Sequence, residues 1–390
     1  MTHPRSFIHA LASGALLASG AMGQFHLTEL LPNPPGTDEG QEAIEIQGLP
    51  SASLAGYFLL VIEGDGSGAG TIDVRQDLGT FTTGSNGLLL IRDVPATAIG
   101  PAPDPNTSVV AFNWTPDIEN GTNTYVLGFG APPAAGTDLD VENDGVLDAG
   151  ALAGFTVVDA VTLVENDGAA NQAYADDLGF AVLGPFDGVS NPGVGSHTPD
   201  AVYRLLDGDG QPGPWAGGDV LGINPGGPYS FDFAPNEVFG LLEAGLTALD
   251  LNPGNANAKV SLKGSPLSIS VAAGGVQQLS LLAGASKAGL LYFLVGSLSG
   301  TTPGFPVDSV ILPLNPDAYF FATLTPNTPL LTPSLGVVNG AGQGTCNFTI
   351  PPATVLGGLP FTGHHAYVIF NLSLGVVTFA SNAVPITLNP

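Results

Sequence analysis

The chain has 390 residues, and its 34 Asp and Glu against seven Lys and Arg give it a formal net charge of −27. Nucleic acid and anionic membranes are bound by cationic surfaces, so a chain this acidic is a poor partner for either, whereas divalent cations suit it. Gly and Pro are abundant, with 55 and 34 residues, yet 44% of the chain is hydrophobic. Turn-rich β-structure around a packed core fits both facts better than disorder does.

The first residues have the layout of a secretory signal peptide. Arg5 precedes a short apolar run over 10–21, and the small residues Ala21 and Gly23 stand at positions −3 and −1 of a cleavage site. The run is too short to cross a membrane, which needs about 20 apolar residues. We therefore expect a signal peptide over 1–23, no membrane insertion, and a protein that is secreted or held at the cell surface. Cleavage would change the net charge from −27 to −28.

Charge divides the rest of the chain. Residues 24–263 contain 32 acids and five bases, whereas residues 264–390 contain two acids and one base. A change of that size within one compact fold is unusual, so we predict one module over 24–235, a linker over 236–263 and a second module over 264–390. The linker includes the best helical candidate of the chain, residues 237–251.

Stretches rich in β-branched and aromatic residues, most of them bounded by Gly, Pro, Asn or Asp, predict short strands along the whole chain. In the first module these stretches are 27–31, 42–47, 57–64, 86–94, 108–114, 124–130, 155–165 and 201–206. In the second they are 267–271, 276–281, 290–298, 309–314, 318–325, 344–351, 366–372, 376–381 and 383–388. This spacing predicts an all-β protein of two β-sandwich-like modules, and consecutive apolar positions in the second predict strands covered on both faces.

The opening of the first module resembles a lamin-tail domain. A strand ends in an Asn-Pro turn, an acidic loop follows, and a Glu-hydrophobic-Glu strand leads to a Leu-x-Gly-Tyr corner. The residues that carry these features are Glu29, Asn33, Pro34, Asp38, Glu42, Glu45, Leu54, Gly56 and Tyr57. The resemblance covers about residues 25–235, with apparent insertions at 61–81 and after Gly136. It implies an immunoglobulin-like β-sandwich with a scaffolding or interaction role. The second module resembles a recurring β-module of uncharacterised secreted bacterial proteins, which implies no function.

An acidic loop over 138–148 is the strongest candidate for a metal site. Its carboxylates are Asp138, Asp140, Glu142, Asp144 and Asp148. Counted from Asp140, oxygens fall at positions 1, 3, 5 and 9 with Gly145 at position 6, a spacing that resembles the loops of thrombospondin type 3 repeats and dockerin-like modules. Ca²⁺ takes about six to eight oxygens and favours a glycine at the sharp turn. We predict a calcium site here; the alternative is a solvated acidic loop.

The remaining candidates predict structure rather than chemistry. The loop 63–70 lacks the Lys of a phosphate cradle, so it predicts a hairpin turn. The acidic loop with Asp207 and Asp209 predicts another turn. Cys346, the one cysteine, excludes an intrachain disulfide and alternates with apolar residues on a predicted strand, which favours a core position.

No His-Glu-x-x-His and no Gly-x-Ser-x-Gly motif is present. We therefore predict a secreted, non-enzymatic structural or adhesive β-protein, stiffened by calcium, whose partner is an extracellular protein or glycan. One alternative is a glycan-binding module, for which the stacking platforms would be Trp114, Tyr125, Tyr203 and Trp215, side chains that core packing also explains. A second alternative is a hydrolase with an unrecognised pair of carboxylates.

Overall fold

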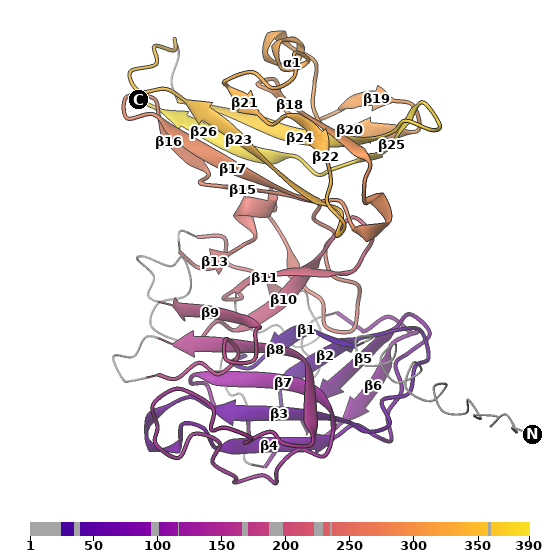
Figure 1. Ribbon diagram of the computed structural model, residues 1–390, viewed down its shortest axis with the longest axis vertical. Coiled ribbons are helices and arrows are strands. Elements are labelled where there is room, and N and C mark those ends of the chain that lie inside the picture. The colour runs from indigo at the N-terminus through magenta and orange to yellow at the C-terminus, as the bar shows by residue number, and fades with distance from the viewer. Residues whose placement is uncertain are drawn as a thin grey trace, which may run out of the picture. The chain divides into compact units, whose positions relative to one another are not determined.

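The computed structural model describes residues 25–34, 40–94, 101–115, 117–165, 171–186, 198–221, 229–234, 236–357 and 360–390. The predicted signal peptide, residues 1–23, lies outside this part of the chain. Strands account for 45% of the structure and helical residues for 5%. The described residues contain one α-helix (Figure 1), so the predicted all-β class is confirmed.

Contacts divide the chain into two compact units. The first consists of residues up to Thr28, Glu39–Thr97 and Ala102–Pro185, and the second of Glu29–Asp38, Ala98–Pro101 and Phe186–Pro390. The division falls within strand β1 (His26–Leu31). The module limits predicted from the sequence, 24–235 and 264–390, are not the limits of these units and stay a prediction.

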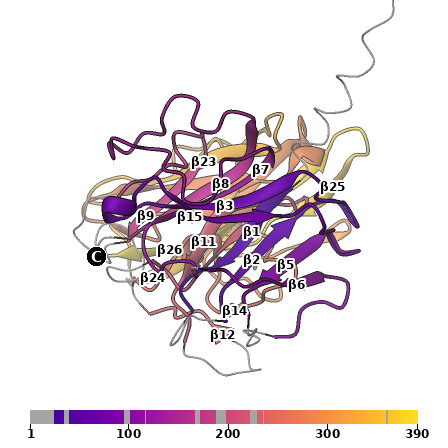
Figure 2. The ribbon, with the colours of Figure 1, turned by 90° about the horizontal axis from the view of Figure 1, so that it is seen from below.

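The first unit contains a sheet with the strand order β4-β3-β7-β8-β9. Its strands are β3 (Tyr57–Glu63), β4 (Ile72–Asp77), β7 (Asn123–Gly130), β8 (Phe155–Glu165) and β9 (Ala181–Phe186). Figures 1 and 2 both show β3, β7 and β8 side by side. Leu60 and Ile62 of β3 pack into one core with Val126, and the alternate residues Leu59 and Val61 are equally buried. Both faces of β3 are covered, which explains its unbroken apolar run.

Further strands of this unit are β2 (Ala43–Gln47), β5 (Leu88–Arg92) and β6 (Ser108–Ala111). β2 pairs antiparallel with β5, and β5 runs parallel to β6. Buried carboxylates join β1 to β2 and to β8. The Thr28 hydroxyl donates to Glu45 Oε1 at 2.7 Å, and the Leu27 N–H donates to Asp159 Oδ2 at 2.9 Å. A buried carboxylate without such donors would be costly, so these bonds help to fix the start of β1.

The C-terminal part of the second unit consists of two facing sheets. Their orders are β15-β17-β23-β21 and β16-β26-β24-β18-β22, with β25 paired to β24. The strands are β15 (Leu262–Ser265), β16 (Ser268–Ser270), β17 (Gly275–Leu282), β18 (Leu291–Ser297), β21 (Leu331–Thr332), β22 (Leu335–Val337), β23 (Gln343–Ile350), β24 (Phe361–Asn371), β25 (Val376–Ala380) and β26 (Val384–Asn389). Leu279, Leu281 and Cys346 from the first sheet meet Tyr367 and Ile369 from the second in a shared core. Cys346 is therefore the core residue that the sequence predicted.

Other short strands of the second unit are β10 (Ala201–Leu206), β11 (Pro212–Gly218), β12 (Tyr229–Ser230), β13 (Val238–Phe239), β14 (Asp250–Leu251), β19 (Phe305–Val307) and β20 (Val310–Leu312). β10 pairs with the end of β1 and with β11, and β11 pairs with β13. The tight link between β10 and β11 contains Asp207 and Asp209. Asp207 Oδ1 accepts the N–H groups of Asp209 and Gln211 at 2.8 and 2.9 Å, so the predicted turn is confirmed.

The strand predicted over 318–325 is wrong. This stretch forms helix α1 (Ala318–Thr323). Asp317 provides the N-cap, because its Oδ1 accepts the Phe320 N–H at 2.7 Å and satisfies one of the donors that a helix start leaves without a partner. Apolar composition alone does not distinguish a one-turn helix from a strand.

The helix predicted over 237–251 is also wrong. The structure has β13, a 3₁₀ turn η2 (Leu242–Ala244) and β14 in this stretch. Gly245 ends η2 in the left-handed conformation with φ 77°. A glycine in that conformation terminates a helix, and the strands on either side use the backbone in an extended form.

The side chain of Asn382, between β25 and β26, links separate segments of the second unit. Its Oδ1 accepts the N–H groups of Ser261 and Leu262, both at 2.9 Å. Its Nδ2 donates to the carbonyl oxygens of Ala244 and Leu262 at 2.8 and 2.9 Å. One amide therefore fixes η2 and the start of β15 against the C-terminal strands.

Replacing this amide tests its structural role. Asn382→Ala removes the partners of backbone groups that η2 and β15 present to it, and each such loss costs about 1–3 kcal/mol when the group stays shielded from water. We expect the free energy of unfolding to fall by about 2–4 kcal/mol in urea denaturation. Asn347→Ala, at an exposed position of β23, is the control and should change it by less than about 0.5 kcal/mol. Equal effects of the two variants would contradict the role assigned to Asn382.

Candidate functional site

The β3–β4 hairpin of the first unit brings acidic side chains together. Glu63 ends β3, Asp73 lies on β4 and Glu119 precedes β7, and a ligand oxygen from each lies within 4.8 Å of those of the other two. We call these three residues the hairpin cluster. The hairpin predicted over 63–70 is present, and its turn contains a 3₁₀ segment over 66–68. A Cβ atom on Gly68 would collide with the Glu63 carboxylate. The turn sequence thus leaves room for this carboxylate.

A β-bulge places Asp73 in the cluster. Val61 pairs with Val74 but Ile62 pairs with Ile72, so Asp73 is the extra residue of β4. Bulges of this kind redirect a side chain and interrupt regular pairing, and they are frequent next to functional sites. Nothing in the residue pattern of this hairpin indicates the bulge, so neither Asp73 nor Glu119 is recognisable as a site residue from the sequence.

The loop that follows Glu63 is held to the segment of Glu119. The Gly64 N–H donates to the Thr122 carbonyl oxygen at 2.7 Å, and the Thr122 N–H donates to Asp65 Oδ2 at 2.7 Å. These bonds fix the position of both segments before any ligand binds. The hairpin cluster is therefore preorganised by the backbone around it.

Burial and like-charge repulsion together raise pKa values in the hairpin cluster. Partial burial and then the charges of Asp73, Glu119 and Asp65 raise the pKa of Glu63 to about 7. Partial burial and the charge of Glu119 raise the pKa of Asp73 to about 6. The cluster therefore favours binding of a proton or a cation near neutral pH. Its donors are all carboxylate oxygens, which are the ligands of hard cations such as Ca²⁺ and Mg²⁺.

A second group of acids in this unit consists of Glu42, Asp93 and Asp117, which also have ligand oxygens within 4.8 Å of one another. Asp117 is exposed, whereas Glu42 and Asp93 are each 1% exposed. Asp93 accepts the N–H groups of Gly40 at 2.8 Å and Trp114 at 3.2 Å, so the chain's own donors already occupy both of its oxygens. This group can hold an ion, but part of its carboxylate capacity serves the fold.

The predicted calcium loop, 138–148, is organised around Asp140. This side chain is fully buried, and it accepts the N–H groups of Asp144 at 3.1 Å and Gly145 at 2.8 Å and the Tyr174 hydroxyl at 2.9 Å. Burial acts to raise the pKa of Asp140, but these hydrogen bonds outweigh it and lower the pKa. The carboxylate oxygens of Asp140 thus already accept three hydrogen bonds from the protein itself.

The other acids of this loop make local turn contacts or point into solvent. Asp138, Asp144 and Asp148 each accept a backbone N–H of the loop, at 3.0, 3.1 and 3.3 Å, and Glu142 is exposed. Within the described ranges, the groups of three acids with clustered ligand atoms include none of the five. The metal set Asp138, Asp140, Glu142, Asp144 and Asp148 stays a prediction.

The aromatic side chains considered as glycan platforms lie in the core. Trp114, Tyr125, Tyr203 and Trp215 are between 1% and 6% exposed. A stacking platform has to present a ring face to solvent, so the platform interpretation is wrong and the packing interpretation holds.

No family model matches the chain, and a comparison with curated proteins found no match. The lamin-tail resemblance therefore remains an expectation from the sequence. Among the described residues, no helix has the length and apolar character needed to cross a membrane.

The raised pKa values predict how stability depends on pH. Between about pH 4.5, the ordinary pKa of a glutamate, and about pH 7, the folded protein holds a proton on Glu63 that the unfolded chain releases. Stability contributed by this group is therefore present at acidic pH and is lost as the pH rises towards 7. In a chelating buffer, Glu63→Gln should raise the melting temperature at pH 8 relative to wild type and leave it nearly unchanged at pH 5. Glu142→Gln, which changes an exposed acid outside the cluster, is the control. If Glu63→Gln changed the melting temperature equally at pH 5 and pH 8, the raised pKa of Glu63 would be contradicted.

Proposed function

We propose that the protein is an extracellular, non-enzymatic β-scaffold that binds Ca²⁺ at the hairpin cluster of its first unit. The observation that carries this proposal is the grouping of Glu63, Asp73 and Glu119, whose ligand oxygens lie within 4.8 Å of one another. The pKa values of Glu63 and Asp73, raised by partial burial and then by neighbouring carboxylates, support it, because a bound cation would offset the cost of holding these charges together.

The oxygen-only ligand set favours calcium over a metal that prefers nitrogen or sulfur ligands, and the small number of ligands favours a weak site. Three carboxylates supply up to six oxygens, and water completes the shell of Ca²⁺, which accepts irregular geometry. Mg²⁺ demands near-octahedral ligands and gives up its water reluctantly. Extracellular calcium modules bind with dissociation constants of about 10⁻⁴–10⁻³ M. An affinity in this range would suit an extracellular protein, which is the location that the signal peptide expected over 1–23 implies.

Calcium at this position would act on structure. Glu63, Asp73 and Glu119 come from β3, β4 and the segment before β7, so one ion would join three parts of the first unit. Binding would replace like-charge repulsion by attraction and would stiffen the hairpin. A stiff and strongly acidic β-protein suits a structural or adhesive role outside the cell.

A calcium titration of thermal stability tests the proposal. Calcium at ten times its dissociation constant should stabilise chelator-treated protein by about 1.4 kcal/mol, which corresponds to a melting shift of about 3–6 °C for a unit of this size. Glu63→Gln and Asp73→Asn should each remove most of this shift, and Mg²⁺ should produce less of it.

Asp144→Asn is the matched control, because it changes an acid of the 138–148 loop and leaves the hairpin cluster intact. We expect it to keep the full calcium shift. The reverse pattern, in which Asp144→Asn abolishes the shift and Glu63→Gln preserves it, would contradict the proposal and place calcium in the loop that the sequence predicted.

A further inference from the structure

One face of the β15-β17-β23 sheet packs into the core, and the other face carries mostly polar side chains, with Val276 and Leu282 of β17 as apolar exceptions. Cross-strand pairing aligns Lys263 with Ser280 and Ser265 with Gln278. The intervening residue Leu279 points into the core of the second unit. This alternation gives the sheet an outer face of hydroxyl, amide and ammonium groups, spaced about 4.8 Å apart between strands and about 7 Å along them.

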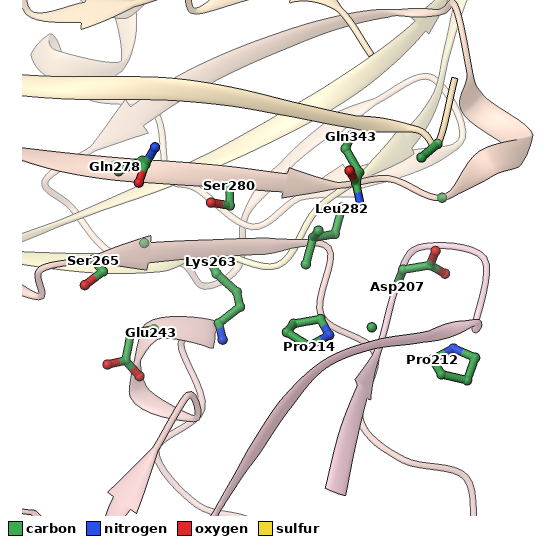
Figure 3. A pocket seen from close by; sticks show the side chains of 14 residues that line it. Asp207, Pro212, Pro214, Glu243, Lys263, Ser265, Gln278, Ser280, Leu282 and Gln343 are labelled. Carbon is green, nitrogen blue, oxygen red and sulfur yellow. The ribbon is translucent and has the colours of Figure 1, made fainter. Parts of the chain in front are cut away.

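Other segments of the second unit turn this face into a cleft. The cavity has a volume of about 590 Å³ and is lined on its far side by Pro212 and Pro214 of β11 and by Glu243 of η2. Figure 3 shows Lys263, Ser280 and Gln278 on the sheet side and the proline rings opposite them. The volume falls in the range of small-molecule sites, about 300–1,000 Å³.

Hydrogen bonds hold the walls of the cleft in place. The Gly208 N–H donates to the Leu282 carbonyl oxygen at 3.0 Å and fixes the β10–β11 turn to the end of β17. Asp209 of the same turn forms an ion pair with Lys287 at 2.5 Å and accepts the Ser286 N–H at 2.7 Å. Burial acts to raise the pKa of Asp209, but these donors outweigh it and lower the pKa to about 2.

The wall formed by η2 is held as well, by the Asn382 amide described above. The cleft is therefore a preorganised feature of the second unit. Preorganisation matters for binding because a ligand does not have to supply the free energy of ordering its site.

The lining selects for an uncharged ligand rich in hydroxyl groups. Hydroxyl and amide side chains both donate and accept hydrogen bonds, which complements a polyol. The proline rings add apolar surface that the C–H faces of a sugar ring can cover. Lys263 is the one cation of the lining, against Glu243 and Asp207, so its formal charge is −1 and a polyanion is not favoured.

We propose that this cleft binds a neutral oligosaccharide. Gln278 and Ser280 supply the central hydrogen bonds from the sheet, and Pro212 and Pro214 cover the ring faces from the opposite wall. The site lies in the second unit and contains no member of the hairpin cluster, so binding does not depend on calcium.

Isothermal titration of the full-length protein with cellohexaose, xylohexaose, mannohexaose, maltohexaose and chitohexaose, in a chelating buffer, tests the proposal. At least one of these should bind, and the double variant Gln278→Ala/Ser280→Ala should weaken that binding by tenfold or more. Both substitutions lie on a solvent-facing strand surface, so the melting temperature should change little. Thr332→Ala, exposed on the same sheet but outside the lining, is the control and should bind as wild type does.

Three outcomes would overturn the proposal. They are the absence of binding to all five oligosaccharides, binding that the double variant leaves unchanged, and binding restricted to an acidic comparison such as oligogalacturonate. Each is independent of the calcium proposal, because the titration is performed with chelator present.

Discussion

The register of antiparallel strand pairing determines which side chains of this protein meet. In the first unit, the shift between the Val61–Val74 and Ile62–Ile72 pairs makes Asp73 a bulge residue and brings it to Glu63. In the second unit, regular pairing of β15 with β17 sets Lys263 beside Ser280 on the outer face and leaves Leu279 in the core. Because the side-chain period of a strand is two, a slip of one residue would exchange these faces. Both proposed sites therefore depend on backbone pairing.

An excess of acids has to be accommodated, and the structure does so in three ways. Asp140 is buried among backbone and tyrosine donors of its own chain. Asp209 has a cation, Lys287, as its partner. Partial burial and the charges of neighbouring carboxylates raise the pKa values of Glu63 and Asp73. The first two arrangements satisfy the charge within the protein, whereas the third leaves it to be neutralised by a proton or an ion. This contrast is why we propose calcium at the hairpin cluster rather than in the 138–148 loop.

The sequence predicted those structural features that depend on residues close together in the chain. The apolar run that became β3, the hairpin turn after it and the core position of Cys346 all follow from local composition and alternation. Local composition failed where a single cap decides the structure, as Asp317 does for α1. The hairpin cluster could not be predicted from the sequence, because Glu119 is 56 residues from Glu63 and a bulge places Asp73 beside them. The polar cleft could not be predicted for a similar reason, since its walls come from segments that lie far apart in the sequence.

The most direct test of the account is the position of calcium in a crystal of the protein grown with millimolar Ca²⁺ and measured for anomalous scattering. The account predicts an anomalous peak between Glu63, Asp73 and Glu119, with oxygen ligands at about 2.3–2.6 Å and water completing the shell. A peak within the 138–148 loop, or no peak at the hairpin cluster, would contradict it.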